Sequence, residues 1–250
     1  MTGASADRPI VCITQARVGS TRLPAKVLMP VAGKPLLWWH LDRLKRSRRF
    51  DRIVVATTGE PAADAIVEIA EQAGVLVFRG SEDDVLDRYA GAAAAAGAAT
   101  VVRVTSDCPV LDPALLDRTI AFYESAGPDC HYAALDVGSF PRGLDCEVFS
   151  REALDQAVRE ATLPGDREHV TPFIRRHVER YGARFLATEA PDQVYRWCVD
   201  TPEDFELLRR IIEHFAPTGG DFGWTDIAML MRANPDWPAI NAGVIQKPAP

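Results

Sequence analysis

The sequence predicts an α/β protein built on a mostly parallel β-sheet, with a smaller β-rich insertion in its second half. Short apolar segments alternate with amphipathic helical segments over residues 10–123, and this alternation is typical of right-handed βαβ units. The first apolar segment, 10–13, is rich in β-branched residues and suits a strand covered on both faces. After residue 128 the segments change character around a turn-rich stretch at 138–143, which favours an antiparallel excursion.

The first half predicts four strands and four helices. Pro35 suits the first turn of a helix, and Leu37, Leu41 and Leu44 recur at helical spacing. Gly74 is placed to end the second helix. We expect strands at 10–13, 52–58, 75–78 and 100–104, and helices at 33–46, 62–73, 83–96 and 113–123.

The second half predicts shorter elements that close over the first half. Thr201 is a natural N-cap, with Pro202 at the first helical position and Asp204 at the third, a carboxylate variant of the capping box. We expect strands at 130–134, 144–149, 185–188 and 196–199, and helices at 151–161, 166–181, 202–215 and 224–232. The ends, 1–8 and 245–250, are expected to be loose tails.

Composition restricts the class of protein. The chain has 250 residues, 47% hydrophobic and 25% charged, with a formal net charge of −7, so a sequence-independent nucleic-acid binder is disfavoured. A local cluster of cations can still bind a small anion. The five cysteines are odd in number and show no CxxC spacing, which suggests neither a zinc site nor a disulfide framework. No run approaches a membrane span or a signal peptide, so we expect a cytoplasmic protein that does not bind membranes.

A basic loop follows the first strand. Cations and hydroxyls gather within ten residues around Gly19, whose backbone can approach a ligand closely; they are Arg17, Ser20, Thr21, Arg22 and Lys26. Backbone N–H groups with Arg and Lys side chains are what a polyphosphate requires. The loop lacks the Gly-Lys-Ser/Thr ending of a Walker motif. The alternative interpretation is a solvated basic turn.

Two aspartates follow buried strands. Asp107 comes three residues after the strand ending at Val104, and Asp200 follows the expected strand 196–199. Ligands of parallel sheets bind beyond the carboxyl ends of the strands, and Mg²⁺ takes carboxylate and phosphate oxygens. The alternative role of Asp107 is to cap the turn that leads into Pro109. The helix cap accounts for Thr201 and Asp204 but not for Asp200, which lies outside it.

Further candidates surround this edge of the sheet. Residues 79–84 after the third strand form either a pocket for a base or a capped turn, and Thr57 is a weaker candidate for that pocket. Arg103 lies within an apolar strand, so its charge needs a ligand phosphate or a structural carboxylate.

Three residues of the second half are candidates for contacting a substrate. Asp145 and Glu147 alternate along the expected strand 144–149, so both side chains should face the same way. They could contact sugar hydroxyls or form a solvated face. His169 could bind an acidic sugar or assist deprotonation, although a lone histidine is more often structural.

The chain resembles the cytidylyltransferases that make CMP-activated sugars, in particular the spore-coat polysaccharide (SpsF-like) family. The synthetases for CMP-sialic acid and CMP-ketodeoxyoctonate share a looser version of the pattern. The resemblance covers roughly the whole chain, in order, in the segments QARVGSTRLPAK (15–26), FRGSEDDVLDRY (78–89), RVTSDCP (103–109), GLDCE (143–147), REHVTP (167–172) and VDTPED (199–204).

The resemblance implies a Rossmann-like fold of the nucleotide-diphospho-sugar transferase type. It implies one nucleotidyltransferase domain over 1–250, with a nucleotide-binding half at about 9–128 and an acceptor-binding, closing half at about 129–250. Related synthetases are often dimers, and Phe140 and Pro141 could lie at such an interface.

The resemblance also implies the reaction and its metal ligands, and with the residue patterns above it gives the expected site. CMP passes from CTP to a sugar or sugar-like acid, pyrophosphate leaves, and Mg²⁺ is held by Asp107 and Asp200. The expected catalytic residues are Arg22, Lys26 and Asp107. The expected nucleotide-binding residues are Gln15, Ala16, Arg17, Gly19, Ser20, Thr21, Thr57, Arg79, Gly80, Asp84 and Arg103. Asp145, Glu147 and His169 are expected to bind the acceptor.

Other classes stay open on the sequence. A glycosyltransferase with a nucleotide-sugar donor shares the sheet but usually has an Asp-x-Asp motif, and residues 106–109 supply one aspartate. A guanylyl- or uridylyltransferase would be a variant of the same fold. A non-catalytic nucleotide-binding protein would need neither aspartate.

Overall fold

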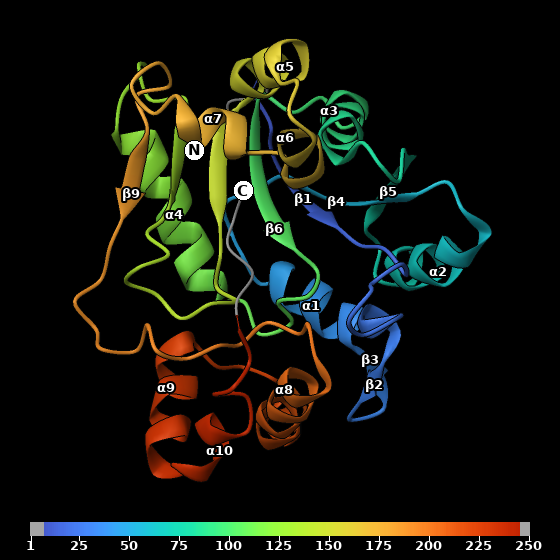
Figure 1. The fold of residues 1–250 in the computed structure, drawn as a ribbon, viewed down its shortest axis with the longest axis vertical. Helices are drawn as coiled ribbons and strands as arrows, with labels where there is room; N and C mark the ends of the chain where they lie inside the picture. The colour runs from blue at the N-terminus through green and yellow to red at the C-terminus, as the bar shows by residue number, and fades with distance from the viewer. Residues whose placement is uncertain (1–7, 246–250) are drawn as a thin grey trace, which may run out of the picture.

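Seven strands form one sheet in the order β5-β4-β1-β6-β8-β7-β9 in the computed structural model, which describes residues 8–245 (Figure 1). Strands β1, β4, β5 and β6 are parallel to one another, whereas β8 runs antiparallel to both β6 and β7. The strands are β1 Ile10–Gln15, β4 Arg52–Thr58, β5 Leu76–Gly80, β6 Thr100–Thr105, β7 Tyr132–Leu135, β8 Glu147–Ser150 and β9 Arg184–Leu186. The mostly parallel sheet and its antiparallel excursion confirm the predicted fold class.

Helices cover both faces of this sheet. Along β1, Cys12 belongs to one apolar cluster while Val11 and Ile13 belong to the other, because successive side chains of a strand point to opposite faces. The helices are α1 Leu36–Leu44, α2 Asp64–Gln72, α3 Val85–Ala95, α4 Pro113–Ser125, α5 Arg151–Glu160, α6 Pro164–His169, α7 Pro172–Arg176, α8 Pro202–Phe215, α9 Trp224–Ala233 and α10 Asp236–Ala239. Figure 1 shows α8, α9 and α10 grouped at the end of the molecule toward which β6 points.

The first predicted helix begins later than expected. A small hairpin of β2 (Pro30–Val31) and β3 (Lys34–Pro35) precedes it, and Pro35 is the N-cap of α1 instead of a residue of its first turn. Short 3₁₀ helices at Lys26–Leu28, Pro61–Ala63 and Ala216–Thr218 were not expected. The other elements of residues 52–125 match the prediction to within a few residues.

Three predictions for the second half are wrong. The expected helix 166–181 is interrupted, because Val170 has φ of 73° and separates α6 from α7. The expected strand 196–199 is reduced to an isolated bridge between Arg142 and Arg196. Strand β8 starts only at Glu147, so Asp145 lies before it and does not share a strand face with Glu147.

Phe140 is buried and packs edge-on against Trp224, so it is not an interface residue as expected; the homodimer itself stays a prediction. Within residues 8–245, no helix has the length and apolar character needed to span a membrane. Of the expected tails, only Arg8 and Ile245 fall among the described residues.

Candidate active site

A cavity of about 490 Å³ opens at the carboxyl ends of β1 and β6. This is the edge at which parallel sheets bind ligands. Most of the residues predicted to bind the nucleotide or act on it line this cavity, namely Gln15, Ala16, Arg17, Ser20, Thr21, Arg22, Lys26, Arg103, Asp107, His169 and Asp200.

The basic loop between β1 and the 3₁₀ helix turns back on itself. The backbone N–H groups of Ser20 and Ala25 both donate to the Val18 carbonyl, at 2.8 and 3.0 Å. Ala25 then adopts a left-handed conformation with φ of 53°, directly before Lys26. This turn directs Lys26 into the cavity. Gly19 lies against the turn between β5 and α3, since a Cβ on Gly19 would be 3.1 Å from Glu82 Oε1.

Lys26 lies between the two predicted metal ligands. Its Nζ is 2.9 Å from Asp107 Oδ2, 2.8 Å from Asp200 Oδ1 and 2.5 Å from the Val199 carbonyl. Arg22 pairs with the other oxygen of Asp200 at 2.9 Å. The loop after β1, the turn after β6 and the segment before α8 therefore meet at one ammonium group.

A buried arginine, Arg196, also pairs with Asp200. Arg196 Nη2 is 2.7 Å from Asp200 Oδ2, while its Nε donates to Asp204 at 2.9 Å. Asp204 also accepts the backbone N–H groups of Asp200 and Thr201, and Thr201 caps α8 in return. The predicted capping box is confirmed, and it fixes the backbone that carries Asp200.

The two carboxylates are ionised at neutral pH. Burial by itself raises the pKa of Asp107, but Lys26 and hydrogen bonds from Thr105 and Cys108 outweigh it and lower that pKa to about 2. The pKa of Asp200 is also lowered, because Lys26 and Arg22 outweigh its burial. The pKa of Lys26 is raised, since the two aspartates outweigh the desolvation of its ammonium.

The donor set suits Mg²⁺. Among residues 8–245 no cluster of three or more His, Cys, Asp or Glu side chains could hold a metal ion. Mg²⁺, however, is usually bound by one or two carboxylates together with waters and substrate phosphates. Asp107 and Asp200 already converge on one cation, the Lys26 ammonium, so their carboxylates fit this pattern.

Arg103 has the structural carboxylate that its burial requires. Its Nη1 is 2.5 Å from Glu147 Oε2, and Glu147 also accepts hydrogen bonds from Tyr132 and Thr171. Glu147 is only 7% exposed, so it does not lie on a solvated face, and it is not among the residues that line the cavity. Arg103 itself faces the cavity, and its buried Nε has no partner among the residues that the structure describes.

Several predicted site residues do not line the cavity. They are Gly19, Thr57, Arg79, Gly80, Asp84, Asp145 and Glu147. Arg79 pairs with Asp64 at 2.5 Å on the surface, and Asp145 pairs with Arg142 at 2.9 Å. The buried Thr57 hydroxyl has no partner within residues 8–245. For the turn 79–84, the alternative of a capped turn fits better, since Asp84 caps α3 by accepting from the Asp87 N–H.

Arg88 lines the cavity but was not among the predicted site residues. This arginine is 1% exposed and lines the cavity from α3, yet none of the described carboxylates forms an ion pair with it. Its Nη1 donates to the Ser81 carbonyl, and its buried Nε has no partner among residues 8–245. A Cβ on Gly80 would lie 2.9 Å from Arg88 Cγ, so Gly80 makes room for this side chain. The segment 78–89 contains both residues, but an arginine inside a helix gives no sign of burial.

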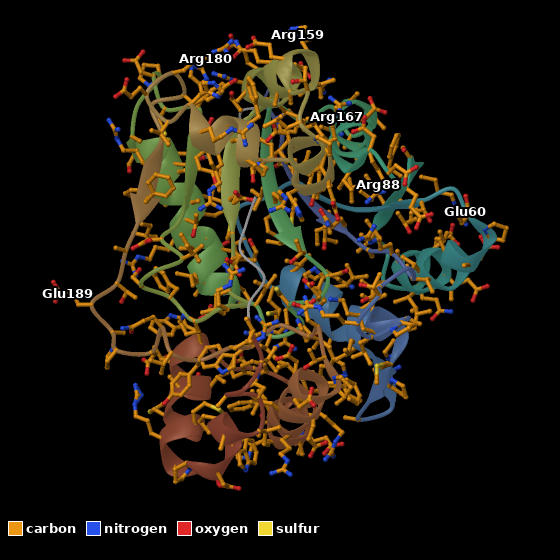
Figure 2. All side chains as sticks on the ribbon, viewed as in Figure 1. Glu60, Arg88, Arg159, Arg167, Arg180 and Glu189 are labelled. Carbon is orange, nitrogen blue, oxygen red and sulfur yellow. The ribbon has the colours of Figure 1, made fainter. Side chains whose placement is uncertain are left out.

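Helix α6, which packs beside α3, also contributes to the cavity wall. His169 lines the cavity, and Glu168 is 4.0 Å from Arg17 of the basic loop. Arg167 ties this helix to α3, because its Nε donates to Asp84 at 2.9 Å. Figure 2 shows Arg88 and Arg167 on the side of the molecule where α3 and α6 meet.

The family model described as cytidylyltransferase matches residues 11–219. The chain is 35% identical over 91% of its length to the spore coat polysaccharide biosynthesis protein SpsF of Bacillus subtilis, of which it covers 95%. It superimposes on a cytidylyltransferase from Leptospira borgpetersenii with a TM-score of 0.88 and 33% identity, covering 92% of this chain and 96% of that one.

A more distant likeness concerns the fold alone. A CMP:2-keto-3-deoxy-manno-octonic acid synthetase complexed with CTP gives a TM-score of 0.61 at 17% identity, covering 82% of this chain and 99% of that chain. The sheet, the cavity at its carboxyl edge and these similarities agree. The chain belongs to the cytidylyltransferase family and is a nucleotidyltransferase enzyme of that family.

Proposed function

We propose that this enzyme transfers CMP from CTP to an oxygen of a sugar or sugar-like acid and releases pyrophosphate. The observation that carries the proposal is the meeting of Arg22 and Lys26 with Asp107 and Asp200 in one cavity. Cations and carboxylates in that arrangement suit a triphosphate that arrives with a divalent cation. The name of the Bacillus relative, a spore coat polysaccharide biosynthesis protein, supports a sugar-related acceptor.

In the proposed reaction, an acceptor oxygen attacks the α-phosphorus of CTP in line with the leaving group. The new oxygen–phosphorus bond forms as the bond between the α-phosphorus and the bridging oxygen breaks, and that oxygen leaves with its electron pair as pyrophosphate. The acceptor proton passes to a base, for which His169 on the cavity wall is the candidate. No covalent enzyme intermediate is required.

The protein contributes positioning and electrostatic stabilisation. Arg22 and Lys26 neutralise charge on the transferred and leaving phosphates, in a site already shaped before the ligand arrives. Asp107 and Asp200 would hold Mg²⁺, which when bound neutralises phosphate charge.

A nucleotide screen followed by an acceptor screen tests the proposal. Thermal shift is measured with CTP, UTP, GTP, ATP and dTTP, each with and without Mg²⁺, because a ligand that binds only the folded state raises the melting temperature. We expect the largest shift with CTP, strengthened by Mg²⁺, and then CTP-dependent pyrophosphate release with an acidic or neutral sugar. A nucleoside-diphosphate sugar is included as a further ligand, and a shift with that sugar nucleotide alone would contradict the proposal.

A further inference from the structure

The backbone at Val170 is strained. Val170 has φ of 73° and ψ of −55°, and the Thr171 N–H donates to the His169 carbonyl at 2.9 Å. These values define a γ-turn with a positive central φ, a rare and strained conformation. Glycine adopts it readily, whereas a β-branched residue there is an outlier. The other non-glycine residues with positive φ among residues 8–245 are alanines, Ala25 and Ala32.

The surroundings hold this turn from both sides. The Val170 side chain is fully buried in the apolar cluster formed with α3, α5 and α7. On its N-terminal side, Arg167 donates to Asp84 and to the Val158 carbonyl, each at 2.9 Å. On its C-terminal side, Thr171 Oγ1 donates to Glu147 at 2.8 Å. Strained residues persist where neighbouring contacts fix them in this way, and they gather at functional sites.

The turn sets the directions of the residues on either side of it. His169 faces the cavity, whereas Thr171 is 3% exposed and points to Glu147, the carboxylate that pairs with Arg103. A continuous helix from α6 into α7, as the sequence predicted, would place these two residues at a different relative angle. Val170 therefore adjoins His169 in the chain and is linked to Arg103 through Thr171 and Glu147.

We propose that Val170 is a positioning residue of the active site, whose strained γ-turn holds His169 in the cavity wall and keeps Arg103 beside the nucleotide. The proposal rests on the proposed function in that the cavity binds CTP. It assigns to Val170 no contact with substrate. Its effect is to keep two cavity side chains in place before the ligand arrives.

Paired substitutions test the strain. Val170→Ala keeps the strained backbone, whereas Val170→Gly removes the steric cost of a positive φ. We expect Val170→Gly to melt at a higher temperature than Val170→Ala, although glycine is normally the less stable of the two. The matched control is Val54, buried in β4 without a positive φ, where the glycine variant should melt below the alanine variant. A Val170→Gly variant that melts below Val170→Ala, or does not fold, overturns the proposal.

The positioning is tested by histidine NMR and CTP titration. The imidazole signal of His169 is assigned among the five histidines with His169→Gln. We expect Val170→Gly to shift or broaden that signal and to weaken CTP binding about fivefold or more, while Val170→Ala does neither. Thr171→Val should weaken CTP binding without moving the His169 signal, because it cuts only the contact with Glu147.

The outcomes separate the two proposals. If Val170→Gly matches Val170→Ala in both the His169 signal and CTP affinity, the positioning role is refuted. If the unaltered enzyme does not bind CTP, the proposed function fails instead, and the melting order and the NMR signal still decide the role of the turn.

Discussion

Lys26 brings three separate segments of the chain together. Its ammonium contacts Asp107 after β6 and Asp200 before α8, and it is 11% exposed. Removing one carboxylate leaves the other still paired with a cation, so the site can lose a catalytic group without exposing an isolated buried charge. Activity and stability can therefore be separated by substitution here.

Arg22→Ala and Asp107→Ala should each lower turnover by about 100-fold or more, because each removes a group that acts on phosphate charge. The free energy of unfolding should change by less than about 1 kcal/mol for Arg22→Ala, whose side chain is 31% exposed. Turnover is measured as pyrophosphate release, and stability by urea unfolding. Arg118→Ala, on the exposed side of α4, is the control; near-normal turnover of either site variant would refute its role.

Acid should destabilise the enzyme partly through Asp107. The folded protein keeps this carboxyl ionised down to a pKa of about 2, whereas in the unfolded chain it takes a proton near its usual pKa of about 3.9. Between these values the unfolded state binds more protons, so the stabilisation is complete above about pH 4 and falls as the pH drops toward 2. Asp107→Asn should show a shallower loss of the urea midpoint between pH 5 and 2. An equal slope in both proteins would contradict this expectation.

Arg88 is buried and has no carboxylate partner in the described part of the chain, which favours a ligand oxygen as its partner. Arg88→Met should therefore weaken CTP binding about tenfold or more, measured by calorimetry, and preserve the melting temperature within a few degrees. Arg79→Met, which removes a surface ion pair with Asp64, is the matched control and should leave CTP affinity unchanged. If Arg79→Met weakened CTP binding more than Arg88→Met did, Arg79 and not Arg88 would be the arginine that contacts the nucleotide.

Some residues of the site could be predicted from the sequence and others could not. Lys26 and Asp107 could be predicted to share a site because the loop after β1 and the turn after β6 meet at the same edge of the sheet. Asp200 was placed there by an expected strand that does not form and by the family resemblance. Arg88 could not, since its burial depends on the missing Cβ of Gly80. Glu147 was predicted to contact sugar, but its partner Arg103 lies on a strand 44 residues earlier, a pairing that local patterns do not show.

Among elements, the regular ones were predictable and the irregular ones were not. Strand and helix periodicity locate β1, β4, β6 and α2 to α4, because each buries a continuous apolar face. The break at Val170 arises from tertiary contacts on both sides of a valine, which carries no sign of a turn in sequence. The segment 196–199 reads as a strand but forms only a bridge to Arg142, because its backbone is turned toward Lys26 and Asp107 instead.

The segment leading to Asp200 depends on Gly143. This glycine has φ of 99°, and a Cβ there would lie 2.4 Å from the Trp197 carbonyl carbon. Gly143→Ala should therefore lower the free energy of unfolding by about 3 kcal/mol or more, from backbone strain and overpacking. Gly59→Ala is the control, since a Cβ there meets nothing within 4 Å; it should change stability by less than about 1 kcal/mol. Urea unfolding of both variants is the measurement, and equal effects would show that this close approach is absent.

Taken as a whole, the molecule builds its cavity from both halves of the chain. Arg17, Arg22 and Lys26 come from the first half, while Glu168 and Asp200 come from the second and pair with them. The ion pairs of the cavity join the two halves of the chain. The expected division into a nucleotide-binding half and an acceptor-binding half therefore concerns which ligand each half contacts, and it stays a prediction. A ligand that binds the basic loop should therefore also stabilise α6 and the segment at the start of α8.

Hydrogen exchange with CTP and Mg²⁺ tests this coupling. We expect slower exchange not only in the basic loop, 16–26, but also in 164–171 and 196–204, because ion pairs join these segments to the loop and local opening of one exposes the others. The opposite edge of the sheet, at the amino ends of the parallel strands, such as the start of β5 with its exposed Leu76, is the internal control and should not change. Protection limited to 16–26 would mean that the nucleotide is bound by the first half alone, and that the second-half segments acquire their order only from the acceptor.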